Sequence, residues 1–220
     1  MRFRTLLFVL LAALVPAAAP AAKLVVPPDF PPSGTLVYDV IRDNALVGSN
    51  EVQFEHTGDR LVVRTTMDIV VSVLFVPVFR FSHRAEEVWL NGELQSYHAT
   101  TDDDGKARDV VLARDGDKLS GFYNGGPIEF PGTLIPGSLW HPATVEQEAL
   151  LETTKGQMRA VSVIDRGMET VKLASGPEPA HHYSISGELR REVWYGADGQ
   201  VVQASFPAKD GSIVVLRLKR

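Results

Sequence analysis

The stretch 87–96 reads Glu-Val-Trp-Leu-Asn-Gly-Glu-Leu-Gln-Ser, the pattern of a strand, a two-residue turn and a second strand. Asn-Gly is favoured in such turns because both central residues need positive φ to match the right-handed twist of the flanking strands. The stretch therefore predicts an antiparallel hairpin centred on Asn91 and Gly92.

Turn signals of the same kind recur along the chain. Those at 91, 104 and 115, and those at 198 and 210, are 11 to 13 residues apart, which leaves room for strands but not for crossover helices. The recurring signals are Gly58-Asp59, Asp104-Gly105, Asp115-Gly116, Asp165-Arg166-Gly167, Asp198-Gly199 and Asp210-Gly211. We therefore predict an antiparallel meander of about 11 to 13 strands. The expected strands are Thr35–Asp43, Ser49–His56, Leu61–Val76, Val78–Leu90, Glu93–Thr101, Ala107–Ala113, Lys118–Tyr123, Gln157–Ile164, Glu169–Ala174, His181–Ser186, Glu188–Tyr195, Val201–Phe206 and Ile213–Leu218.

One short helix is expected at Pro142–Leu151, between two runs of strands. Proline suits the first turn, Glu146 and Glu148 suit the positive end of the helix dipole, and Lys155-Gly156 is a cationic stop followed by glycine. Because twist accumulates across so many strands, the sheet should curl. The expected fold is mainly all-β, a meander curled into a barrel or half-barrel with one helix.

The segment Ile69–Phe81 is apolar on both faces of the predicted strand. A strand with one face in water normally alternates apolar and polar residues, so this one is covered twice or borders something other than water. Pro77 cannot donate to a strand ladder and indicates a bend or bulge there. Three interpretations remain open, namely a central strand pair under the helix, the wall of an apolar cavity for an acyl chain, and a membrane-touching loop.

On the cavity interpretation, we name candidate ligand-binding residues. Arg80 would lie at the cavity rim, or in an ion pair with Glu86, Glu87 or Asp68, since an unpaired buried guanidinium is costly. Trp140 would be a lid. The candidate cavity wall consists of Ile69, Val71, Val73, Phe75, Phe79 and Phe81.

An internal similarity relates residues 87–96 to residues 192–201, where Trp194 stands in the place of Trp89. Either an old duplication put the two tryptophans at equivalent sheet positions, or two hairpins merely look alike. Both tryptophans are expected in the core.

Residues 1–21 predict a signal peptide, with Arg2 and Arg4 before an apolar run and a small-residue cleavage site at Ala19-Pro20-Ala21. The apolar run is shorter than the roughly 20 residues needed to span a bilayer, so we expect cleavage near Ala21 and no transmembrane segment afterwards. Residues 22–33 predict a proline-rich extended lead-in, and residues 34–220 a single β-rich domain.

Composition and motifs exclude several classes of function. The chain has 220 residues, a formal net charge of −5 and no basic run, which argues against nucleic-acid binding. It has no cysteine and no HExxH motif, so we expect no metal and no cofactor. His83 and His98 could meet across the Asn91-Gly92 hairpin, the one histidine pairing that the turn suggests.

No catalytic residue is assigned. Ser138 and His141 are near in sequence but lack the nucleophile-elbow motif, so a hydrolase is the weaker alternative. The segment 138–142 more simply predicts an entry to the helix, with Trp140 plugging the open end of the sheet.

Several motifs together resemble an uncharacterised family of exported bacterial proteins, a domain of unknown function. They are Val37-Tyr38-Asp39-Val40 with Gly48, Phe79-Arg80-Phe81-Ser82-His83-Arg84, Glu87-Val88-Trp89, Asp102-Asp103-Asp104-Gly105-Lys106, Ser138-Leu139-Trp140-His141-Pro142, and Trp194-Tyr195 before Asp210-Gly211-Ser212. The resemblance implies a Gram-negative periplasm and no established activity. By fold analogy alone, the expected meander is also similar to the half-open barrels of LolA-like lipoprotein carriers.

The leading hypothesis is a periplasmic, non-enzymatic module that binds or carries an apolar small molecule or lipid. The alternative is a structural or interaction protein of the cell envelope, with a fully packed core and an envelope protein as partner. A contiguous apolar void of about 300 Å³ or more beside Phe75 and Phe79 would favour the first.

Overall fold

The computed structural model describes residues 30–220, so the predicted signal peptide lies outside the described residues. The described residues contain 14 strands and one short 3₁₀ helix, η1 (Pro142–Glu146). The strands are β1 (Gly34–Arg42), β2 (Ala45–Thr57), β3 (Arg60–Val73), β4 (Val76–Leu90), β5 (Glu93–Asp103), β6 (Lys106–Asp115), β7 (Lys118–Tyr123), β8 (Gly126–Pro131), β9 (Ala149–Glu152), β10 (Gln157–Leu173), β11 (Gly176–Gly187), β12 (Arg191–Tyr195), β13 (Val201–Pro207) and β14 (Ile213–Leu218).

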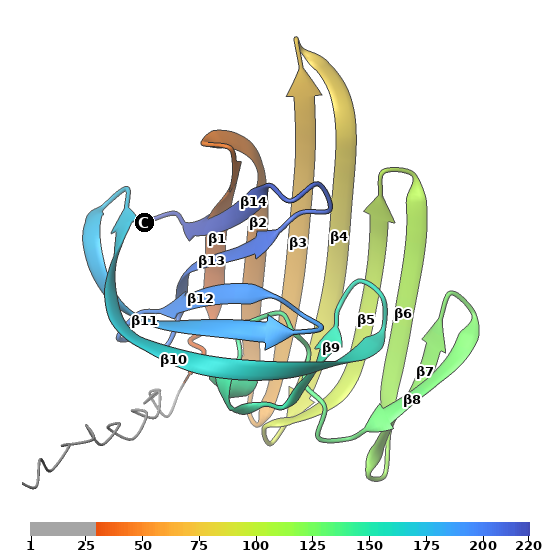
Figure 1. The fold of residues 1–220 in the computed structure, drawn as a ribbon. Coiled ribbons are helices and arrows are strands. Elements are labelled where there is room, and N and C mark those ends of the chain that lie inside the picture. The colour runs from red at the N-terminus through yellow and green to blue at the C-terminus, as the bar shows by residue number, and fades with distance from the viewer. Residues whose placement is uncertain (1–29) are drawn as a thin grey trace, which may run out of the picture.

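All the strands form one open sheet, in the order β8-β7-β6-β5-β4-β3-β2-β1-β14-β13-β12-β11-β10-β9. The chain makes two meanders, β1–β8 and β9–β14, which join where β1 pairs antiparallel with β14, for example Tyr38 with Leu218. The sheet curls, so that the second meander lies across the concave side of the first (Figure 1). The predicted curled antiparallel meander is confirmed.

The turns explain the meander. Five of the hairpins in the described residues have two-residue turns in which both residues have positive φ, the geometry that matches strand twist. These turns are Asp43-Asn44, Leu74-Phe75, Asn91-Gly92, Asp104-Gly105 and Asn124-Gly125.

The predicted helix is the main correction to the fold. Only Pro142–Glu146 is helical, as a single 3₁₀ turn, and Ala149–Glu152 is the edge strand β9, paired with β10. Leu150 and Leu151 are completely buried. Their burial against the rest of the sheet outweighs the helix-favouring glutamates, because helical propensity is a weak local preference.

Two further differences concern strands. Asp165-Arg166-Gly167 is a bulge inside β10 and not a turn, so one strand replaces two expected ones. The sequence prediction missed β8, which has prolines at Pro127 and Pro131. Proline is tolerated there because β8 is at the edge of the sheet, where a missing N–H breaks no central ladder.

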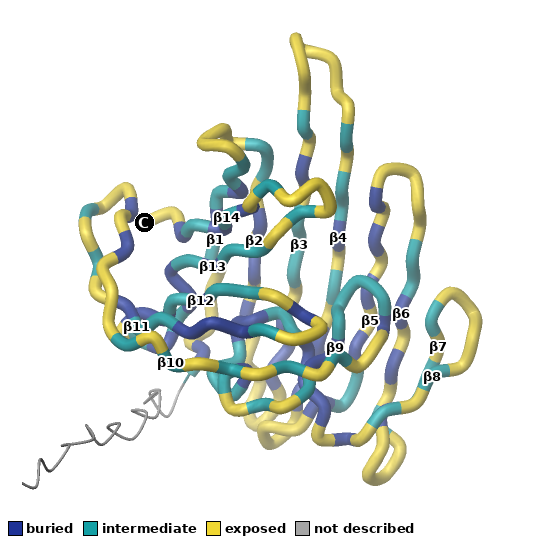
Figure 2. The backbone as a smooth tube through the Cα atoms, viewed as in Figure 1, coloured by how far each residue is buried: buried dark blue, intermediate teal, exposed yellow. Residues whose placement is uncertain are grey.

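The core lies between the two meanders and is closed by residues 132–148, which we call the crossing loop. This loop connects the two edge strands, and Leu134, Leu139 and Trp140 on it are buried. Trp140 contacts Phe54 of β2 edge to face, and the Leu139 carbonyl accepts a hydrogen bond from the Tyr195 hydroxyl of β12 at 2.7 Å. The loop therefore fills the space that the curled sheet encloses. Buried positions concentrate in this enclosed part of the molecule (Figure 2).

Candidate functional site

The hairpin β3–β4 extends beyond its neighbours on both sides. Pairing of β2 with β3 stops at Gly48 and Ile69, and pairing of β5 with β4 stops at Phe81 and Asp103. Residues 70–80 therefore pair only with one another, as in Val70 with Arg80. We call these residues the free ribbon. It projects past the other hairpins at the same end of the sheet (Figure 1).

The end of the free ribbon, residues 73–78, is apolar and exposed, and we call it the apolar tip. Large apolar side chains are normally found exposed one at a time, whereas here they are consecutive. The exposed fractions are 56% for Val73, 88% for Leu74, 100% for Phe75, 61% for Val76 and 54% for Val78. The whole tip is solvent-exposed along the tube in Figure 2.

The turn of the apolar tip has an unfavourable backbone for its residues. Leu74 and Phe75 have φ of 49° and 67°, in the left-handed region. The four other turns of this geometry use only Asp, Asn and Gly, which adopt it readily. A bulky residue held there costs on the order of 1–3 kcal/mol. The turn residues thus oppose folding and gain no burial in return.

The residues predicted to form one cavity wall are not brought together. Ile69 is buried, and Val71 and Phe81 pack partly buried against the core. Val73 and Phe75 instead point into solvent. The predicted wall is therefore divided between the core and the apolar tip, because the sheet on both sides ends at Ile69 and Phe81. Whether any of these residues binds a ligand stays a prediction.

Phe79 and Arg80 lie at the base of the free ribbon, half-buried and exposed respectively. Arg80 is therefore not the buried cation that the sequence suggested. Its expected carboxylate partners are engaged elsewhere: Asp68 pairs with Arg84 and Glu86 pairs with Arg64. Within residues 30–220 the Arg80 side chain has no ion pair, whereas its backbone bonds to Asp104 of the neighbouring turn.

Trp140 lies in a buried cluster and is not a surface lid. Its indole Nε1 donates to Oε2 of Glu87 at 3.1 Å, and the Nε1 of Trp89 donates to the same oxygen at 3.0 Å. The two indole rings meet edge to face, 5.5 Å apart, and His141 stacks on Trp89. The cluster joins the crossing loop to β4. Of the two roles predicted for Trp140, the plug of the open end of the sheet therefore fits the structure better than the lid of a cavity.

Glu87 is the unusual group in this cluster, because it is a carboxyl with only 1% of its surface exposed. Burial raises the pKa of Glu87 to about 7, and the nearby Ser138 hydroxyl and the two indole groups only partly offset that effect. Neither Glu87 Oε1 nor Ser138 Oγ has a well-aligned hydrogen bond. If Glu87 is protonated, its carboxyl proton can be donated in a hydrogen bond, which an ionised carboxylate at this position could not do.

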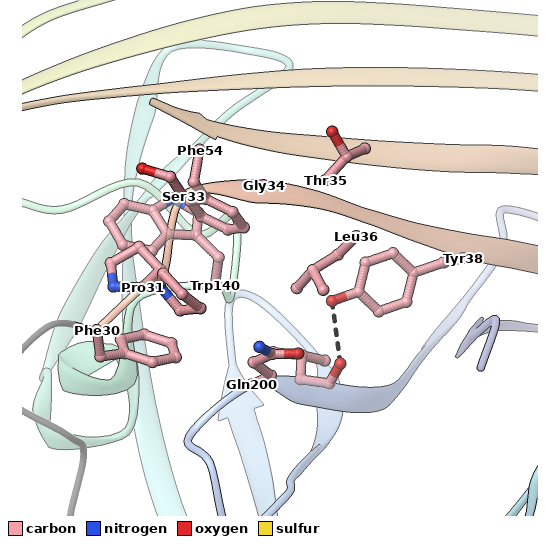
Figure 3. Close-up of a pocket in the computed structure, with 12 residues that line it drawn as sticks. Phe30, Pro31, Ser33, Gly34, Thr35, Leu36, Tyr38, Phe54, Trp140 and Gln200 are labelled. Atoms are coloured by element: carbon pink, nitrogen blue, oxygen red, sulfur yellow. Dashed lines mark hydrogen bonds between the residues drawn. The ribbon is translucent and has the colours of Figure 1, made fainter. Parts of the chain in front are cut away.

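A small pocket opens beside Trp140, where the end of the lead-in passes the sheet (Figure 3). It has a volume of about 150 Å³ and is lined by apolar side chains that include Phe30, Leu36 and Phe54. The lead-in is held there by His56, whose Nε2 lies 2.7 Å from the Pro31 carbonyl oxygen. This volume is about half of the smallest usual ligand pocket.

A second, open hollow of about 440 Å³ lies on the β7–β8 hairpin, between Ser120 and Glu129. Neither hollow is lined by residues 69–81. The void expected beside Phe75 and Phe79 is therefore not found at either place.

The described residues do not bring together the side chains that a hydrolase or a metal site would need. Ser138 Oγ is buried beside Glu87 with no well-aligned hydrogen bond, and Nδ1 of His141 accepts from the Ala143 N–H, so the two residues do not form a nucleophile–base pair. Across residues 30–220 no group of three His, Asp or Glu side chains could hold a metal ion.

The structure does not bring His83 and His98 together, and it buries only one of the two tryptophans that were expected in the core. His83 is buried and bonds to Thr101, whereas His98 is opposite Glu86 on the outer face and bonds to Asp109. Trp89 is 3% exposed in the core, but Trp194 stacks on His182 at the surface. The two tryptophans therefore do not occupy equivalent positions.

Sequence reasoning missed Leu74, Val76 and Val78 as candidate site residues, because they alternate with the residues of the predicted cavity wall and were therefore expected on the opposite face. In the described part of the chain, none of the helical structure is long and apolar enough to cross a membrane.

Comparison with known proteins places the fold. A crystal structure of a β-barrel-like protein of the domain of unknown function DUF1849 from Brucella abortus superposes with a TM-score of 0.59 and 12% sequence identity, over 84% of this chain and 96% of that one. At this identity the likeness concerns the fold alone. No curated protein matches the sequence. The model of the domain of unknown function DUF6134 matches residues 38–219, and the chain belongs to that family.

Proposed function

We propose that this protein is an exported, non-enzymatic binding module that contacts a lipid-like apolar partner through the apolar tip of β3–β4. The observation that carries the proposal is that Leu74 and Phe75, 88% and 100% exposed, occupy a turn whose backbone disfavours them. Strain of this kind persists where it serves function. Exposed apolar patches of this kind commonly mark interaction sites.

The interior supports an external site rather than a carrier cavity. The crossing loop places Leu139 and Trp140 inside the curled sheet, and the pocket beside Trp140 measures only about 150 Å³. An acyl chain would not fit in that space, since ligand pockets start at about 300 Å³. The apolar character of residues 69–81 is thus explained partly by the core and partly by a partner that the tip contacts.

Export to the periplasm is part of the proposal. It is supported by the charged start, short apolar run and small-residue cleavage site of residues 1–21. A periplasmic module faces membrane surfaces, lipids in transit and envelope proteins, all of which offer apolar partners.

The experiment uses the absence of cysteine from the chain. Ser72→Cys places one thiol in the free ribbon without altering any apolar residue, and Ser175→Cys, in the β10–β11 turn, is the matched control; both serines are exposed. The two variants are labelled in intact cells with a polar maleimide that crosses the outer membrane but not the inner one. The purified proteins are labelled in parallel.

We expect equal labelling rates in the purified proteins, and in cells fast labelling at position 175 with slow labelling at position 72. Equal, fast labelling of both positions in cells would overturn binding by the tip. Labelling of neither position in cells, with normal labelling after lysis, would overturn export.

A further inference from the structure

We infer that the partner of the apolar tip is the surface of a lipid bilayer, entered at shallow depth by Leu74, Phe75 and the valines beside them. This inference rests on the proposed function and names its target. A groove in another protein is the competing occupant, and four features of the free ribbon favour the bilayer.

The first feature is that the tip is apolar in every direction. Val73 and Val76 are paired neighbours at the end of the ribbon, and Val78 and the two turn residues complete a cap with no charged side chain. From Ile69 to Phe79 the sequence contains no charge at all. A protein groove contacts one face of a hairpin and leaves the other in water, whereas a bilayer surrounds the inserted end on all sides.

The second feature is shape. The tip projects farther than the neighbouring turns at its end of the sheet, Asp43-Asn44 and Asp104-Gly105 (Figure 1). A flat surface can therefore reach the tip before it meets any other part of the protein at that end. The neighbouring turns, which carry Asp43 and Asp104, would stay in water.

The third feature concerns the ribbon's outer edges, whose backbone groups have no neighbouring strand between Ile69 and Phe81. Unpaired backbone groups are costly in hydrocarbon, so only the turn and the first residue pairs can enter. Pro77 lacks an N–H at this edge, which also makes it a poor template for an added strand from a protein partner. Asp68 and Arg80, at the base of the free ribbon, are the first charged residues on either side of the uncharged stretch, and they would stay in water.

The fourth feature is the choice of turn residues. A hairpin turn that served only the fold would use Asn-Gly, as the β4–β5 turn does at Asn91-Gly92. Leucine and phenylalanine at this turn instead give the largest apolar volume at the point that first reaches a surface. Their side chains would gain on insertion the burial that they lack in the folded protein.

Charge is not expected to drive binding. The chain carries a net charge of −5, and the turns around the ribbon are rich in aspartate. Binding by apolar insertion should therefore occur on zwitterionic vesicles, resist salt and gain nothing from anionic lipid. Because only a few side chains insert, the binding should be weak and reversible, as for a single short lipid anchor.

The test is flotation of the purified chain with phosphatidylcholine vesicles, with and without phosphatidylglycerol, at low and high salt. The key variant is Leu74→Asn with Phe75→Gly, which removes the two most exposed apolar side chains and installs the favoured turn pair. Leu46→Asn is the control, because Leu46 is 66% exposed on the β1–β2 hairpin outside the ribbon. Thermal unfolding shows that each variant is folded.

We expect the wild-type chain and Leu46→Asn to float with vesicles of both compositions. The double variant should show at least about a tenfold weaker partitioning while unfolding at the same or a higher temperature. Equal flotation of the double variant and the wild type would overturn the inference. Absence of wild-type flotation together with protection of Ser72→Cys in cells would overturn the bilayer but leave the proposed function standing. If the wild type does not float and Ser72→Cys is not protected in cells, both the bilayer inference and the proposed function are overturned.

Discussion

Trp140 and Glu87 are 53 residues apart in sequence, and their side chains are joined by a hydrogen bond of 3.1 Å in the core of the protein. Trp140 belongs to the crossing loop and Glu87 to β4, so the bond fixes the loop against the first meander. A carboxyl group in this position is costly to ionise, since almost none of it contacts water. The stability of the fold should therefore depend on its protonation.

Replacing Glu87 with glutamine should remove a pH dependence of stability. Burial raises the pKa of Glu87 from 4.5 to about 7, so the folded state holds the proton more tightly than the unfolded state. The stability that this proton provides is complete below pH about 4.5 and is lost as the pH rises through about 7, a change on the order of 3 kcal/mol. Urea unfolding at pH 5 and pH 8 measures it.

Comparing the wild type with Glu87→Gln separates the contribution of Glu87 to the pH dependence of stability from that of His83. Burial lowers the pKa of His83 to about 4, so its contribution runs the other way and is lost as the pH falls from 6.5. Both proteins keep His83. A difference in unfolding free energy that is the same at pH 5 and pH 8 would show that Glu87 is ionised in the folded state.

Trp140 should matter to stability through both its ring and its N–H. Trp140→Ala removes a side chain that is 6% exposed and contacts Phe54 and Trp89, so we expect a loss of about 3–5 kcal/mol. Trp140→Phe keeps much of the packing but takes one donor from Glu87, so the loss should be about 1–2 kcal/mol. Chemical denaturation separates the two, and similar small losses for both variants would mean that the crossing loop does not hold the meanders together.

The Leu74→Asn, Phe75→Gly variant should be more stable than the wild type. It replaces two residues at φ of 49° and 67° with residues that prefer that region, and it removes almost no buried surface. We expect a gain of about 1–3 kcal/mol in the free energy of unfolding. The converse exchange, Asn91→Leu with Gly92→Phe, should lower it by a similar amount. A double variant less stable than the wild type would mean that the native turn is not strained.

Gly48 should be irreplaceable at the point where the free ribbon leaves the sheet. A Cβ at position 48 would lie 2.0 Å from the Asp68 carbonyl oxygen, a backbone atom that cannot move aside without disturbing the β2–β3 pairing. Gly48→Ala should therefore cost about 1–3 kcal/mol, while Ser49→Ala, at the next and exposed position, should be nearly neutral. Equal effects in thermal unfolding would contradict the close approach of the two strands.

The architecture was largely predictable because most turns use residues with a specific backbone preference. Asn91-Gly92 and Asp104-Gly105 mark their hairpins directly. The same rule misses the turn at Leu74-Phe75, because neither residue favours a turn. The predicted strand therefore runs through this turn to Val76. The edge strand β9 was also hidden. It pairs with residues of β10 that are near in sequence, but the turn between the two strands ends in Lys155-Gly156, which equally suits the end of a helix.

The candidate site was predictable as a segment but not in its geometry. Absence of charge from Ile69 to Phe79 indicated that these residues meet something other than water. Which of them face the core depends on where pairing with the neighbouring strands stops, at Gly48 of β2 and Asp103 of β5. That length mismatch is a tertiary property, and it converts an expected cavity wall into a projecting tip.

The most direct test of the central claim is the depth of a nitroxide on Ser72→Cys in the presence of phosphatidylcholine vesicles. Its collision rates with oxygen and with a water-soluble nickel chelate are compared with those of the same label on Ser175→Cys. We predict that vesicles raise oxygen access and lower nickel access at position 72, with no change at position 175. A label at position 72 that stays as accessible to nickel with vesicles as without them would contradict insertion of the tip.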